Sequence, residues 1–140
     1  MQLTILAVGR LRDPAVQALC DDYLRRAQRH LKLQLVECRG EAELRKRIPE
    51  NARVVLLDAG GCTFDSRGFS RWLDEQLTYG REALVFVLGG AEGHGDAVRA
   101  RADETLSLGP MTLPHRLARV VLVEQIYRAI SILRGEPYHK

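Results

Sequence analysis

Short apolar runs alternate along this chain with segments whose apolar residues recur at helical spacing. The runs have the length of strands and are bounded by turn residues, which is typical of strands in a buried sheet. Strands that alternate with helices indicate a parallel sheet flanked by helices. We therefore predict one α/β domain over residues 1–140, with about five parallel strands at residues 3–8, 31–36, 53–57, 83–88 and 104–108.

The first helix is expected to begin after Asp13, an N-cap residue, with Pro14 at the first helical position. The apolar residues that follow fall on one continuous helical face: Val16, Leu19, Cys20, Tyr23, Leu24 and Ala27. The far end of this helix is basic, with Arg25, Arg26 and Arg29. These cations either complement the helix dipole or contact the phosphates of a structured RNA.

Three further helices lie between the strands. Asp65 or Ser66 caps one that ends at Gly80. Residues 41–48 and 96–102 predict two short helices. The basic residues of the first short helix predict only a solvated face: Arg45, Lys46 and Arg47.

The last helix, expected at residues 116–133, is apolar over a wide arc. At 100° per residue its apolar side chains span about 200°, whereas a surface helix needs about 100°. Such a helix is either central in its own domain or packed on a second copy. Because the sheet covers one side, we predict a homodimer through this helix, which Glu at Ile126 or Ala129 should disrupt. The arc comprises Ala118, Val121, Leu122, Val123, Ile126, Ala129, Ile130 and Leu133.

One charged residue of this helix, Arg119, falls inside the apolar arc. A buried arginine has to be paired or to serve a ligand, which makes Arg119 a functional candidate. Glu124, Arg128 and Ser131 share the opposite, polar side.

The amino-acid composition excludes some classes of protein but does not identify the function. The formal net charge of +3 and the isoelectric point near 9.0 permit an RNA partner but do not require one. The three cysteines are isolated, so no paired zinc or redox motif is expected. There is no signal-peptide pattern and no apolar run as long as a membrane helix. We expect a cytoplasmic protein with no metal and no membrane contact.

Two loops rich in Gly and Pro follow two of the strands. The first carries Gly89, Gly90, Gly93 and Gly95, and the second runs from Gly109-Pro110 to Pro114-His115. Ligands of open α/β sheets bind at the carboxyl ends of strands, so these loops predict a binding site. The glycine spacing fits neither the dinucleotide fingerprint nor the phosphate-binding loop. Read by themselves, the glycines are equally typical of simple turns.

The order of the motifs resembles one known family. The chain reads LGGAEG, then LSLGPMTLPH, then RVVLVEQIYRA, and finally PYHK, with LTILAVGRL at its start and VVLLD near its centre. This series resembles the RlmH family of SPOUT-class methyltransferases, which act on N3 of a pseudouridine in large-subunit (23S) ribosomal RNA. The resemblance spans essentially the whole chain. The segment between Val36 and Val54 is shorter than the family pattern.

The resemblance implies S-adenosyl-L-methionine as the methyl donor and a deep trefoil knot at the C-terminal end. It also implies ribosomal RNA as the substrate, within the ribosome. By the family pattern, the cofactor-binding residues are Leu57, Gly89, Leu108, Gly109, Pro110, Met111, Thr112 and Leu113.

Methyl transfer to N3 requires loss of a weakly acidic imide proton, so a base or a stabilising cation is needed. His115 lies in the second loop, and Pro137 restrains the tail so that Tyr138 can stack on the target base. The catalytic candidates are His115, Arg119, Arg128, Tyr138 and His139.

Two other functions have to be weighed. A non-catalytic RNA-binding module would use Arg25, Arg26 and Arg29 but would leave both Gly/Pro loops without a purpose. A hydrolase would use His115, but the chain has no G-x-S-x-G nucleophile elbow.

Overall fold

A computed structural model of the chain describes residues 1–90 and 92–139, with residue 139 described by its backbone alone. Its centre is a parallel five-stranded sheet in the order β2-β1-β4-β3-β5. The α/β fold with a five-stranded parallel sheet, predicted from the apolar runs, is confirmed. The strands are β1 (Gln2–Val8), β2 (Lys32–Cys38), β3 (Arg53–Cys62), β4 (Ala83–Leu88) and β5 (Glu104–Leu106).

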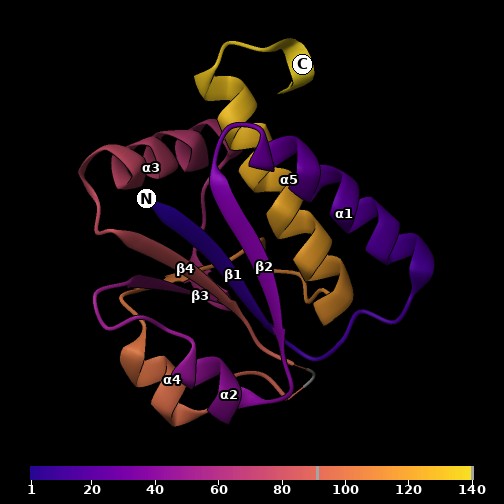
Figure 1. Cartoon of the computed structure of the whole chain (residues 1–140), viewed down its shortest axis with the longest axis vertical. Coiled ribbons are helices and arrows are strands. Elements are labelled where there is room, and N and C mark those ends of the chain that lie inside the picture. The colour runs from indigo at the N-terminus through magenta and orange to yellow at the C-terminus, as the bar shows by residue number, and fades with distance from the viewer. Residues whose placement is uncertain (91, 140) are drawn as a thin grey trace.

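Helices cover both faces of the sheet. The three long helices α1, α3 and α5 lie on one face, and the short helices α2 and α4 lie on the other (Figure 1). Their bounds are α1 (Pro14–Gln28), α2 (Glu41–Lys46), α3 (Ser66–Tyr79), α4 (Asp96–Arg101) and α5 (His115–Leu133), followed by the 3-10 turn η1 (Pro137–His139).

Strands β1 and β4 and the first half of β3 are buried on both faces, because their side chains alternate between two core layers. Ile5 and Phe86 belong to the layer beneath the long helices, and Leu6 and Val87 belong to the layer beneath the short ones. All four side chains are 0–1% exposed. This explains why the strand segments read as continuous apolar runs.

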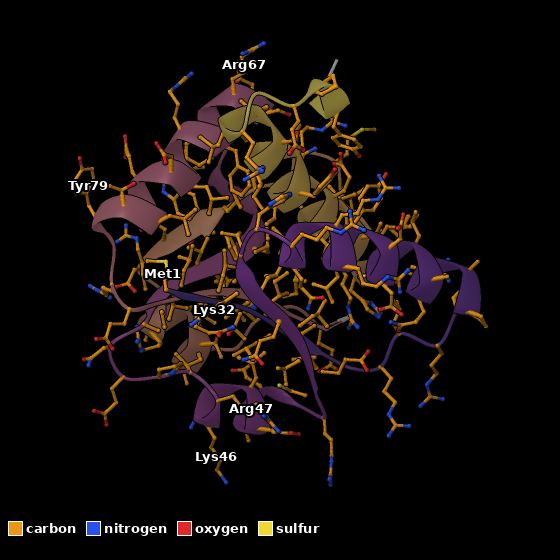
Figure 2. The ribbon with its side chains drawn as sticks, turned by 45° about the horizontal axis from the view of Figure 1, so that its top comes forward. Met1, Lys32, Lys46, Arg47, Arg67 and Tyr79 are labelled. Atoms are coloured by element: carbon orange, nitrogen blue, oxygen red, sulfur yellow. The ribbon has the colours of Figure 1, made fainter. Side chains whose placement is uncertain are left out.

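The helix signals act as predicted. Asp13 caps α1 by accepting hydrogen bonds from Ala15 N at 2.9 Å and Val16 N at 3.3 Å. Asp65, not Ser66, caps α3. Lys46 and Arg47, at the end of α2 and just after it, are both exposed, and Lys46 extends away from the domain, as a solvated face should (Figure 2).

Helix α5 is the central helix of its own layer. It packs against α1 on one side and α3 on the other, with the sheet beneath it. Ile126 is 0% exposed and Ala129 is 1% exposed within the single chain. Most of the apolar arc is therefore covered by neighbouring elements of the same chain, while Val121 and Leu133 stay at least partly exposed. The width of the arc does not by itself require a second copy, and the homodimer stays a prediction. Glu at either position would disrupt the core.

The carboxyl ends of β3 and β5 differ from the prediction. Strand β3 does not stop at Leu57 but resumes pairing at Cys62 after a shift in register. Strand β5 ends at Leu106, two residues early, because the Ser107 hydroxyl turns back to bond Gly109. The trefoil knot that the resemblance implies stays a prediction. In the described part of the chain, no helix is both long and apolar enough to cross a membrane.

Candidate functional site

A cavity of about 680 Å³ opens at the carboxyl ends of β3 and β4, beside the first residues of α5. It is built by the two Gly/Pro loops, as the sequence predicted. Its size is that of a small-molecule site. The lining residues are Leu57, Asp58, Ala59, Leu88, Gly89, Gly90, Gly93, His94, Leu108, Gly109, Met111, Thr112, Leu113, Pro114, His115 and Ala118.

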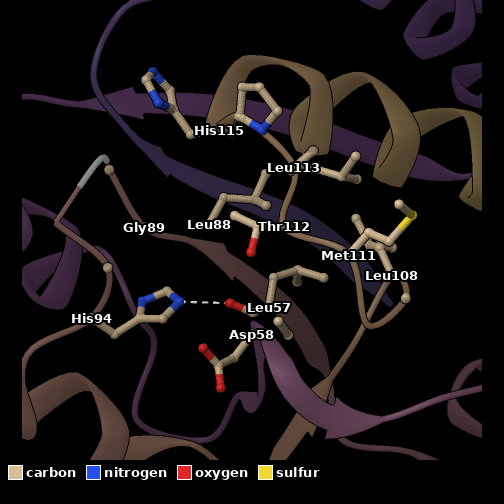
Figure 3. Close-up of a pocket in the computed structure, with 16 residues that line it drawn as sticks. Leu57, Asp58, Leu88, Gly89, His94, Leu108, Met111, Thr112, Leu113 and His115 are labelled. Atoms are coloured by element: carbon tan, nitrogen blue, oxygen red, sulfur yellow. Dashed lines mark hydrogen bonds between the residues drawn. The ribbon is translucent and has the colours of Figure 1, made fainter.

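The structure brings together most of the residues expected to bind the cofactor. All of them except Pro110 line this cavity. Pro110 lines an adjoining groove of about 550 Å³, between the β3–α3 connection and α5. The leucines of the set enclose the cavity from β3 and from the loop after β5, and Figure 3 shows Leu57, Leu88 and Thr112 facing one another across it. A flat aromatic ring fits such apolar walls.

The first loop folds back tightly on Gly89. A Cβ added to Gly89 would lie 2.9 Å from the Gly93 carbonyl oxygen and 3.0 Å from Cε1 of His94. Gly93 itself has a φ of +78°, which favours glycine, and its N–H donates to the Gly90 carbonyl at 3.0 Å. Gly89 is therefore required for the loop to close, not only for the space it leaves to a ligand.

His94 is a cavity residue that the sequence argument missed. Its Nε2 lies 2.7 Å from the Leu57 carbonyl oxygen. A carbonyl can only accept, so Nε2 carries the proton and donates to it. This bond ties the glycine loop to the end of β3, as the dashed line in Figure 3 shows. The residue stood between Gly93 and Gly95, so its place in the loop was a signal that could have found it.

Asp58 is the second missed residue and contributes a carboxylate to the lining. It directly follows Leu57 in β3, and its Oδ1 lies 3.6 Å from the Arg99 guanidinium of α4. Its position at the carboxyl end of a buried strand was the available signal. Elsewhere in the described residues no group of three His, Cys, Asp or Glu side chains gathers as metal ligands do.

The catalytic candidates are not gathered in one place. His115 lines the cavity and begins α5. Arg128 lies thirteen residues further along the same helix, about 20 Å away at 1.5 Å per residue. Tyr138 packs beside Arg128, whose Cζ lies 5.1 Å from the ring centroid. The side chain of His139 lies outside the described residues.

Arg119 is buried and paired. Its side chain is 3% exposed, its Nη1 donates to Glu37 at 2.6 Å, and its Nη2 donates to the Gly9 carbonyl at 3.1 Å. Glu37 also accepts from Leu11 N at 2.8 Å. Arg119 thus joins α5 to β2 and to the loop after β1, and the cavity lining reaches Ala118 but does not include Arg119. Ser131, expected on the polar side of α5, is also buried and donates to the Arg128 carbonyl.

We expect Arg119→Met to lower the free energy of unfolding by about 1–3 kcal/mol, the usual cost of charged hydrogen bonds left unmade. Partial burial would raise the pKa of Glu37, but the Leu11 N–H and Arg119 outweigh it and lower that pKa. The pair therefore stabilises the fold above the ordinary carboxyl pKa, and this contribution is lost as the pH falls through the lowered pKa. Urea unfolding across that range measures both effects.

The matched control is Arg116→Met, an exposed arginine one turn earlier on α5, which should change stability by less than about 0.5 kcal/mol. Equal stability of the two variants would show that the Arg119 pair is not structural.

Comparison with known proteins gives a consistent result. The profile of the family described as "Predicted SPOUT methyltransferase" matches residues 1–139. "Ribosomal RNA large subunit methyltransferase H" of Gemmatimonas aurantiaca is 43% identical over 155 residues, with 100% of each chain covered. The protein of the same name from Hyphomonas neptunium is 44% identical, covering 100% of this chain and 99% of its own.

A solved structure shows the same fold at low identity. A probable methylase family protein from Haemophilus influenzae aligns with a TM-score of 0.56 and 10% identity, over 95% of this chain and 66% of that one. At this identity the likeness concerns the fold alone.

Proposed function

The chain belongs to the SPOUT methyltransferase family, and on this premise we propose that it is an S-adenosylmethionine-dependent RNA methyltransferase. Its proposed substrate is N3 of a pseudouridine in large-subunit ribosomal RNA. The full-length relatives named for large-subunit ribosomal RNA favour this substrate. Such an enzyme works where ribosomes are, so we place it in the cytoplasm.

The observation that carries the proposal is the cavity at the two Gly/Pro loops. Seven of the eight residues that the family pattern gives to the cofactor line it. Leu57, Leu88 and Leu108 offer apolar walls for an adenine ring, and the glycine turns bring backbone N–H and C=O groups to the same space. When bound, S-adenosylmethionine supplies an electrophilic methyl group. The residues present fit such a ligand.

The protein has to hold the base and remove or stabilise its N3 proton. Of the candidates, His115 lines the cavity and has an imidazole that can accept a proton. Burial raises the pKa of Tyr138, and its contacts with Tyr23 and Glu124 raise it further. The Tyr138 phenol therefore stays protonated and suits stacking or hydrogen-bond donation, not general-base work.

The separation of these groups along α5 favours a site made by two copies. The cavity lies at the start of α5, and Arg128 and Tyr138 lie at its end. In a two-fold pair each contact is made twice, so antiparallel α5 helices place the tail of each copy beside the cavity of the other. The outward side of α5 is available for this contact, because Leu117 is 41% exposed and Val121 is partly exposed.

We expect Val121→Glu to give a folded monomer that binds S-adenosylmethionine but no longer methylates RNA, since the charge would stand in the α5–α5 contact. Analytical ultracentrifugation at micromolar concentration measures the state. Leu19→Glu, on an exposed position of α1, is the control and should remain dimeric. A wild-type protein that sediments as a monomer would contradict the homodimer.

The proposed function itself is tested by two measurements. Calorimetry should show binding of S-adenosylmethionine, whereas a non-catalytic RNA-binding module would bind RNA and show no affinity for the cofactor. Methylation of bare ribosomal RNA, isolated subunits and intact ribosomes then identifies the substrate. Cofactor binding without transfer to any of the three would refute the assignment to ribosomal RNA.

A further inference from the structure

At the far end of α5 from the cavity, one carboxylate holds both Arg128 and Tyr138. We infer that this residue, Glu124, is a positioning residue that fixes the two side chains as one unit for the target base. The inference rests on the proposed function, since the unit acts only if the protein methylates RNA.

Arg128 and Tyr138 both contact the same carboxylate oxygen, Oε1 of Glu124. Glu124 Oε1 accepts from Arg128 Nε at 2.9 Å and forms an ion pair with Arg128 Nη2 at 2.7 Å. The same oxygen accepts from the Tyr138 hydroxyl at 3.1 Å. Its second oxygen, Oε2, accepts from Gln125 Nε2 at 3.0 Å. Glu124 therefore has both oxygens engaged, and its side chain is only 16% exposed.

The ring of Tyr138 completes the unit. Arg128 Cζ lies 5.1 Å from the Tyr138 centroid, within the range of a cation–π contact. Tyr127 meets the same ring edge-on at 4.7 Å, and Tyr23 of α1 does so at 6.3 Å. Aromatic packing sets where the ring lies, and the hydroxyl bond to Glu124 sets how it is turned. The tail thus has a defined place after the Gly135 turn, which has a φ of +69°.

Charge indicates that Glu124 acts through its partners and does not contact RNA. A carboxylate repels phosphate, and here it neutralises the Arg128 cation. If Glu124 merely lay near the RNA, removing its charge would strengthen RNA binding. If it positions Arg128 and Tyr138, removing its charge lowers transfer, because both donors lose the acceptor that orients them.

The test compares Glu124→Gln, which keeps the shape and removes the charge, with Glu124→Met, which removes both acceptors. Single-turnover methylation of ribosomal RNA should fall on the order of tenfold in the first and further in the second, the range set by a lost charged hydrogen bond. Cofactor affinity should stay unchanged, and both variants should remain folded at the assay temperature with Tm lowered by only a few degrees, because the donors around Glu124 lose their acceptor. The matched control, Glu136→Gln, removes an exposed carboxylate that accepts from Arg134 at 2.9 Å and should keep the wild-type rate.

A double-mutant cycle with Tyr138→Phe separates positioning from general damage. Because Glu124 acts partly through the Tyr138 hydroxyl, the combined variant should lose less than the product of the two single losses. The inference would be overturned if the loss of rate in the combined variant equalled the product of the two single losses. It would also be overturned if both Glu124 variants kept the wild-type rate, or if they bound RNA more tightly and transferred faster. A loss of cofactor affinity would place Glu124 in support of the cavity and would equally overturn it. A wild-type protein that transfers no methyl group refutes the proposed function and this inference with it.

Discussion

Gly89→Val is expected to abolish binding of S-adenosylmethionine while leaving the domain folded. A Cβ at this position would meet the Gly93 carbonyl oxygen at 2.9 Å and His94 at 3.0 Å, and real Cβ atoms tolerate neither comfortably. The glycine loop would have to open, which removes the His94 bond to Leu57 and one wall of the cavity. Calorimetry should show affinity reduced at least about 100-fold, which is about 2.7 kcal/mol.

The same reasoning extends to Gly89→Ala, because the conflict begins at the first side-chain carbon. A matched control is Gly40→Ala at the start of α2, where an added Cβ meets no atom within 4 Å and the backbone is extended. That variant should bind the cofactor as the wild type does. If Gly89→Ala keeps full affinity, the loop is not the constraint, and if Gly89→Val also binds normally, Gly89 does not belong to the site.

Much of the fold follows from local rules, since most of its elements carry their own signals. The strand at residues 83–88 is a continuous apolar run because it lies between two neighbours and two helix layers, and its bounds were predicted correctly. Helix α1 is marked by the Asp13 cap, which the sequence alone makes visible. Such features depend on neighbours in the chain.

Features that depend on distant contacts were less accessible. Strand β3 resumes its pairing at Cys62 because Cys62 pairs with Leu106 of β5. No sequence pattern near Cys62 predicts this contact. The wide apolar arc of α5 was equally consistent with a central helix and with a dimer helix. Only the placement of α1 and α3 around it shows that most of the arc is covered within the chain, which leaves the outward side of α5 for a second copy.

The residues of the site also divide into those that local sequence signals predict and those that depend on distant contacts. The glycines predicted where the cavity would open, because turns at the ends of parallel strands have a fixed place in the fold. His94 and Asp58 were missed because one histidine or one aspartate in a loop is common, and its importance lies in what it meets. Arg119 was expected to be paired or to serve a ligand, and the sequence did not contain the information that Glu37 is its partner.

Removal of residues 137–140 is expected to leave cofactor affinity and dimerisation nearly intact while methyl transfer falls by at least about tenfold. Stacking of a base on an aromatic side chain contributes ~1–3 kcal/mol by alanine substitution, so the loss of Tyr138 alone accounts for that factor. Single-turnover methylation and calorimetry on the truncated chain measure the two quantities. A frayed terminus predicts no change in either, and loss of both would mean that the tail supports the cavity.

Mixing the Gly89→Val chain with the truncated chain tests whether the tail acts at the cavity of its own chain or at that of the partner chain. Neither the Gly89→Val chain nor the truncated chain should methylate by itself, because one lacks a usable cavity and the other lacks the tail. In a mixed dimer, the cavity of the truncated chain meets the tail of the Gly89→Val chain, and that one site is complete. Random pairing makes about half of all dimers mixed, with one of two sites intact in each, so about a quarter of wild-type activity should return. If each chain completes its own site, no mixed dimer contains an intact one, and mixing restores nothing.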